Sequence, residues 1–147
     1  MGLVKFRPSS PPILVVASLL VSVYNKQEPY HRQCMAALDR VNQPLVTCEP
    51  VVMEAIYLLR SLPGAPQAIL ASIQKGLLEI PFQLAHGVEE VLVYYTKYRD
   101  TPCDFADACL IQTANALDTG DILTLDSDFK HYHWPRNRRF NLLIPLE

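Results

Sequence analysis

Short apolar runs alternate along the chain with segments in which apolar residues recur every three or four positions. The runs have the length and composition of strands buried in a parallel sheet, and they cover residues 13–17, 45–47, 122–125 and 141–146. The periodic segments predict helices with one buried face, and they cover residues 18–24, 29–41, 49–59, 66–75, 88–100 and 105–119. This alternation predicts an α/β fold whose parallel sheet is covered by helices on both faces.

Proline and glycine mark the ends of several elements. Residues 77–84 read as a strand broken near Pro81, which suits the edge of a sheet. Pro50 fits the first position of a helix, and Gly76 and Gly120 are predicted to end helices.

The sequence predicts a loose leader at residues 1–12 and a single domain at 13–147. Lys5 and Arg7 before the apolar residues 13–24 imitate a secretory signal. That run is too short to span a bilayer and is interrupted by serines, so a strand leading into a helix is the favoured interpretation.

Half of the 147 residues are apolar and the net charge is −2, which gives no global bias toward nucleic acid or membrane. A polyanion must therefore meet a local basic patch. The four cysteines form no CxxC pair, so we expect reduced thiols in a cytosol, each a small core residue.

Acidic residues gather at two places that an α/β fold brings to one edge of its sheet. Asp104 and Asp107 begin the helix at residues 105–119, where backbone N–H groups and the helix dipole favour negative charge. Asp126 and Asp128 follow the carboxyl end of the next strand, where ligands bind in open α/β sheets. Converging carboxylates repel one another unless a cation neutralises them, and all-oxygen ligands suit Mg²⁺ or Mn²⁺. Jointly, these residues favour a metal site.

Each acid also has a structural interpretation. Asp104 and Asp107 fit the cap and third position of a helix. Asp126 and Asp128 fit a turn after a strand. Glu54, inside the helix that follows the second strand, can reach the same sheet edge, although an isolated glutamate on a helix is more often a solvated surface residue.

The segment at residues 130–139 is the one concentrated basic patch of the sequence. Its candidate RNA contacts are Lys130, Arg136, Arg138, Arg139 and Trp134. Beside the carboxylates, the cations would hold phosphates, and Tyr132 or Trp134 would stack on an unpaired base. The alternative is a solvated loop with Trp134 in the core. His131 and His133 have the spacing of a metal pair on a strand, but in a loop they fit surface residues better.

Three segments resemble the PIN-domain family, in particular the small VapC-type toxins of bacterial toxin–antitoxin pairs. They are ILVVASLLVSVYNKQEPYH, PLVTCEPVVMEAIYLL and, most specific, DFADACLIQTANALDTGDILTLDSDF. The resemblance implies a three-layer α/β/α sandwich and a cytoplasmic endoribonuclease that depends on Mg²⁺ or Mn²⁺. It also implies a homodimer without membrane association, whose partners are RNA and an antitoxin protein that holds it inactive.

The family's acidic positions fall on Glu54, Asp107 and Asp126, which the resemblance implies are catalytic metal ligands. Asp104 and Asp128 are nearby auxiliaries of the catalytic set. Thr124, two residues before Asp126, matches the family's hydroxyl position.

The sequence departs from the family at its first acidic position, which falls on Val16 at the end of the opening strand. A valine there removes an anionic ligand, so we expect weakened metal binding by the remaining carboxylates.

Three functions compete on these grounds. The first is a PIN-type endoribonuclease, the toxin of a toxin–antitoxin pair. The second, favoured by Val16, is a catalytically impaired PIN-fold protein that binds RNA or a partner. The third is a phosphatase with an aspartate nucleophile, which is weaker because that chemistry wants an Asp where Val16 stands.

Overall fold

The computed structural model describes residues 11–98 and 105–145, so most of the predicted leader lies outside it. The helices are α1 (Ala17–Tyr24), α2 (His31–Asp39), α3 (Glu49–Leu58), α4 (Ala65–Gln74), α5 (Leu84–Lys97) and α6 (Phe105–Leu117). The strands are β1 (Ile13–Val15), β2 (Leu45–Val46), β3 (Leu78–Glu79), β4 (Asp121–Leu123), β5 (His133–Trp134), β6 (Arg138–Arg139) and β7 (Asn141–Leu142). A 3₁₀ turn, η2 (Ser127–Lys130), follows β4.

A parallel sheet of five strands, in the order β3-β2-β1-β4-β7, forms the centre of the fold. After β1 the chain adds β2 and β3 on one side, and then adds β4 and β7 on the other side. The strand order therefore reverses between β1 and β4, and in open α/β sheets this switch point opens a crevice at the carboxyl ends of the strands. Val16 and the residues after Leu123 lie there.

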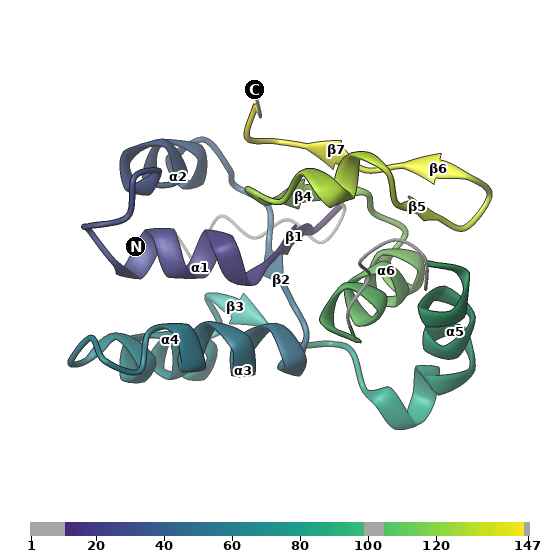
Figure 1. Cartoon of the computed structure of the whole chain (residues 1–147), viewed down its shortest axis with the longest axis horizontal. Coiled ribbons are helices and arrows are strands. Elements are labelled where there is room, and N and C mark those ends of the chain that lie inside the picture. Colours follow the sequence, from purple (N-terminus) through teal and green to yellow (C-terminus); the bar gives the residue numbers. More distant parts are fainter. Residues whose placement is uncertain (1–10, 99–104, 146–147) are drawn as a thin grey trace.

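Helices flank the sheet, as the alternating pattern predicts (Figure 1). In this view α1 to α4 pack together in the left half of the molecule, and α5 packs against α6 on the right. The predicted α/β fold is thus confirmed.

The burial of α6 differs from the sequence prediction. The sequence predicts one buried face for the helix at residues 105–119, but Phe105 at its start is 40% exposed. Nearly the whole helix from Ala106 to Ala114 is buried, including Gln112 and Thr113. The reason is that α6 contacts α5, α3 and β5, so neighbours surround it. The first turn of α6, which carries Asp107, is therefore held by packing.

The two predicted helix stops have different outcomes. Gly76 follows α4 with a left-handed φ of 78°, as predicted. At the end of α6 the left-handed residue is Asp118, with φ 52°, and the N–H of Thr119 donates to the carbonyl of Ala114 in the pattern of a Schellman cap. The stop predicted at Gly120 is therefore wrong, and the glycine serves close packing instead. A Cβ there would lie 2.6 Å from the indole nitrogen of Trp134.

The basic segment is more regular than the loop that the sequence predicts. It forms η2 and then an antiparallel hairpin of β5 and β6. Residues 135–137 connect the paired residues Trp134 and Arg138, and two of them, Arg136 and Asn137, have positive φ of 69° and 58°. A single asparagine is a weak turn signal, so the sequence did not predict the hairpin.

Other predictions concern strands, thiols and membranes. The strand expected at residues 77–84 is reduced to β3, which does lie at a sheet edge. Cys34, Cys48 and Cys109 are buried thiols, as expected, and Cys103 lies outside the described residues. In the described ranges, no helix has both the length and the apolar character needed to cross a membrane.

Candidate metal centre

Three carboxylates converge at the switch point of the sheet. One oxygen each from Asp107, Asp126 and Asp128 lie within 4.8 Å of one another, and all three residues are half-buried. Asp107 stands in the first turn of α6, and the other two stand at the start of η2, just beyond β4. The structure thus brings together acids that are about twenty residues apart in the sequence.

Local hydrogen bonds position Asp126 at the end of the strand. The buried hydroxyl of Thr124 accepts the backbone N–H of Asp126 at 2.8 Å. The Asp126 carboxylate in turn accepts the backbone N–H of Asp128 at 2.9 Å, which caps η2. The N–H of Leu125 donates to the hydroxyl of Ser18 at 3.2 Å and so ties this segment to α1. Together these bonds hold the carboxylate in one orientation.

A buried tyrosine positions Asp107. The phenol of Tyr132 donates a hydrogen bond to Oδ2 of Asp107 at 3.1 Å. The Tyr132 ring is fully buried, and its centroid lies 4.9 Å from that of Tyr98 and 5.1 Å from that of Phe129. Stacking of Tyr132 on a base, expected from the sequence, would need the ring to leave the core. Its role in orienting Asp107 was missed, because the only signal is an aromatic residue in a basic segment.

Electrostatics at the cluster favour a cation. Burial raises the pKa of Asp126, and the negative charge of Asp128 raises it further, although the backbone N–H of Asp128 acts in the opposite direction. Within the described ranges, the one ion pair joins Arg138 to Asp118 at 2.8 Å, so no protein cation there pairs with Asp126 or Asp128. Crowded, partly desolvated carboxylates are the donor set that Mg²⁺ or Mn²⁺ accepts. The residues therefore fit such an ion.

Thiols next to the cluster do not add to this donor set. Cys48 donates to the carbonyl of Ala106, at 3.8 Å, one residue before Asp107. A hydrogen bond with Cys109 and burial both raise the pKa of the Cys48 thiol, so it stays protonated. The candidate site is thus made of oxygen ligands.

Two residues of the predicted catalytic set are not part of this group. Glu54 lies exposed on α3, outside the cluster that Asp107, Asp126 and Asp128 form. Asp104 lies outside the described residues. Their catalytic roles, and that of Glu54 as a metal ligand, remain predictions.

Val16 occupies the switch point where the family places an acid. It is 5% exposed, its N–H donates to the carbonyl of Leu123 at 3.4 Å, and it stands at the N-cap of α1 without a side-chain cap. The position between β1 and β4 therefore carries an apolar side chain.

Three of the predicted RNA contacts are exposed, and the other two, Arg138 and Trp134, contact each other. Lys130, Arg136 and Arg139 are exposed. Arg138 pairs with Asp118 and lies 3.4 Å above the ring of Trp134.

Trp134 itself is only 7% exposed, and its indole N–H donates to the carbonyl of Arg139. Stacking of Trp134 on a base would require it to leave this place, so its RNA-binding role remains a prediction. His131 and His133 join no metal-type cluster among the described residues.

Replacing Tyr132 by Phe is expected to weaken metal binding and activity by about 10- to 100-fold, because Asp107 loses the donor that orients it. The free energy of unfolding should fall by about 0.5–1.5 kcal/mol, the net worth of one hydrogen bond. Calorimetric titration with Mn²⁺ measures the affinity. Tyr95→Phe, on an exposed side chain of α5, is the matched control. Equal Mn²⁺ affinity in both variants would show that the phenol does not position Asp107.

Comparisons with known proteins agree with the fold. A model of the PIN domain family matches residues 13–135. Among solved structures, the fold is similar to the crystal structure of VapC20 from Mycobacterium tuberculosis, a toxin that cleaves the sarcin–ricin loop, with a TM-score of 0.74 and 18% sequence identity. That similarity covers 81% of this chain and 93% of VapC20. A search of curated protein sequences found no significant match.

Proposed function

Since this chain belongs to the PIN-domain family, we propose that it is a metal-dependent endoribonuclease that hydrolyses RNA phosphodiesters. The observation that carries this proposal is the convergence of Asp107, Asp126 and Asp128 at the switch point of the sheet. The likeness to VapC20, a toxin that cleaves the sarcin–ricin loop, supports RNA as the substrate and a toxin as the biological role.

The residues of the cluster have distinct tasks in this function. Asp107, Asp126 and Asp128 would hold Mg²⁺ or Mn²⁺, with Glu54 and Asp104 as further candidates. A bound ion of this kind polarises a phosphodiester and lowers the pKa of water. Thr124 and the turn of η2 keep Asp126 in place, and Tyr132 keeps Asp107 in place. Such prior orientation lowers the barrier, because the ligands need not rearrange during the reaction.

A catalytically impaired protein that binds RNA or a partner is the second candidate. Val16 favours it, because the buried apolar side chain at the switch point supplies no ligand. In that case RNA binding persists without metal-dependent turnover.

We also propose a cytoplasmic location, a homodimer and an antitoxin partner, by the resemblance to VapC-type toxins. Large apolar side chains exposed on α3 and α5 support protein partners, since an interface would remove their apolar surface from water. The most exposed ones on α3 and α5 are Met53, Tyr57, Leu92 and Val93.

The nuclease proposal is tested by incubating the purified chain with a mixed pool of structured RNAs, in Mn²⁺ and in EDTA. We expect discrete cleavage products in Mn²⁺, none in EDTA, and restored cleavage when Mn²⁺ is added back. Cleavage that persists in EDTA would contradict metal dependence, and RNA binding without cleavage in any condition would favour the second candidate.

A further inference from the structure

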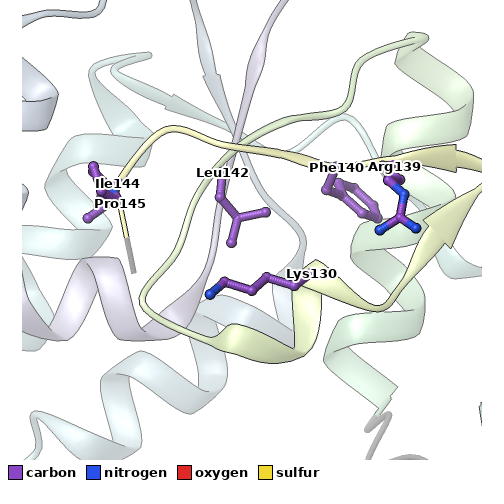
Figure 2. Close-up of a pocket in the computed structure, with 6 residues that line it drawn as sticks. All are labelled: Lys130, Arg139, Phe140, Leu142, Ile144 and Pro145. Carbon is purple, nitrogen blue, oxygen red and sulfur yellow. The ribbon is translucent and has the colours of Figure 1, made fainter. Parts of the chain in front are cut away.

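A pocket of about 420 Å³ lies along the outer edge of the sheet, between η2 and β7 (Figure 2). Its lining residues are Lys130, Arg139, Phe140, Leu142, Ile144 and Pro145. Lys130 and Leu142 extend into it from opposite sides, Arg139 and Phe140 lie at one end, and Ile144 and Pro145 lie at the other. The pocket thus combines two cations with an apolar wall.

The two cations are available to a ligand. Lys130 and Arg139 are exposed, and neither forms an ion pair with any described residue. Their neighbour Arg138 differs, because Asp118 and the ring of Trp134 engage its guanidinium. Among the residues that the structure describes, none that lines the pocket carries a carboxylate. A ligand that fits this pocket is an anion with an apolar part, which describes a nucleotide.

The pocket is also close to the carboxylate cluster. Lys130 ends the 3₁₀ turn that Asp126 caps, four residues away. With a rise of about 2 Å per residue in such a turn, the two positions are separated by roughly 8 Å along its axis. A nucleic-acid strand with a phosphate at the cluster can therefore reach the pocket with a neighbouring nucleotide.

Resting on the proposed nuclease function, we propose that this pocket binds a nucleotide of single-stranded RNA next to the cleaved phosphodiester. Lys130 and Arg139 each contact a different phosphate of the strand, and Leu142 and Pro145 form the surface that receives the base of the bound nucleotide. The pocket thereby selects unpaired RNA, because a base within a helix cannot reach an apolar wall at the sheet edge.

The test compares Lys130→Gln, Arg139→Gln and the double variant with the unchanged chain. A control double variant, Lys26→Gln with Lys75→Gln, removes two exposed charges. These lysines follow the carboxyl ends of α1 and α4, towards the amino ends of the strands, whereas the cluster lies at the carboxyl ends. Binding of a fluorescein-labelled single-stranded RNA of mixed sequence is followed by anisotropy over a range of salt concentrations. Ca²⁺ replaces Mg²⁺, and gels verify that the RNA stays intact.

The expected result follows from counterion release. Each lost phosphate contact should lower the slope of log K against log salt by about 0.7 for a single strand. The affinities of the variants should converge at about 1 M salt. At about 0.1 M salt, each single variant should bind RNA roughly fivefold more weakly than the unchanged chain, and the double variant roughly 25-fold more weakly. The control should bind like the unchanged chain, and a fully paired duplex should bind all variants alike.

Two results would overturn the proposal, and they differ. If the unchanged chain binds RNA but the pocket variants match the control in affinity and slope, the pocket is not the subsite, while the nuclease function stands. If the unchanged chain neither binds nor cleaves RNA at any salt concentration, the nuclease function fails and the subsite fails with it.

Discussion

Replacing Val16 by Asp is expected to increase Mn²⁺ affinity and RNA cleavage, each on the order of 100-fold. Val16 follows β1 directly and bonds to β4 through its backbone, so a carboxylate there enters the crevice beside Asp126. Changing a residue that hydrogen-bonds to a metal ligand alters metal affinity or activity by about 10- to 100-fold. Adding a residue that binds the metal directly should have an effect at the upper end of that range. Without metal, the added charge at a buried position should lower stability.

The Val16→Asn variant separates the effect of the added negative charge from the effect of a new helix cap. Val16 is the N-cap of α1 and makes no side-chain cap, so either Asp or Asn adds a cap worth about 0.5–2 kcal/mol. Only Asp adds an anionic ligand. Calorimetric Mn²⁺ titration and RNA cleavage of both variants measure the difference, and equal affinity in the two would show that position 16 does not face the ion.

Replacing Asp126 by Asn is expected to reduce metal-dependent cleavage by at least about 100-fold, because the cluster loses its central anionic ligand. The variant should also be more stable than the unchanged chain in EDTA at neutral pH. Burial and the charge of Asp128 raise the pKa of Asp126, so its ionised form is disfavoured in the folded state. The asparagine removes that cost while keeping the size of the side chain.

The pH dependence has a definite sign. A carboxyl group whose pKa is raised by folding binds its proton more tightly in the folded state, so its contribution to stability is fully present below the unfolded pKa of about 3.9. That contribution is lost as pH rises through the folded pKa. Thermal melts in EDTA should therefore show the unchanged chain losing stability relative to Asp126→Asn over this window.

Asp39→Asn, on the exposed face of α2, provides the matched control for these melts. It should follow the unchanged chain at every pH. If Asp126→Asn also follows it, the carboxylates at the cluster do not repel one another in the folded state. If Asp126→Asn cleaves RNA as well as the unchanged chain, Asp126 is not a metal ligand.

The convergence of Asp107 and Asp126 could be predicted because it depends on local pattern. An acid in the first turn of a helix and an acid after a buried strand both point to the carboxyl edge of a parallel sheet. Asp128 follows from its place two residues beyond Asp126. The exposed position of Glu54 could not be read in the same way, because the orientation of a residue along α3 depends on how that helix packs.

Packing between distant segments decided the remaining features. Tyr132 bonds to Asp107 across 25 positions of sequence, and Trp134 fills the space above Gly120. Neither contact leaves a periodic signal, because each joins one residue to one distant partner. The sequence shows only that Tyr132 and Trp134 stand among basic residues, and for this reason they were predicted to stack on bases.

The sequence by itself determined the α/β class, the order along the chain of the helices and of the strands of the parallel sheet, and the carboxylates at the start of α6 and after β4. These properties depend on periodicities of two and 3.6 residues and on end signals, which are local. Only the tertiary structure decided that α6 is enclosed on nearly all sides, that a phenol orients Asp107 and that Lys130 and Arg139 share a pocket. Those features require segments to pack against each other, and packing depends on the shapes of both partners at once.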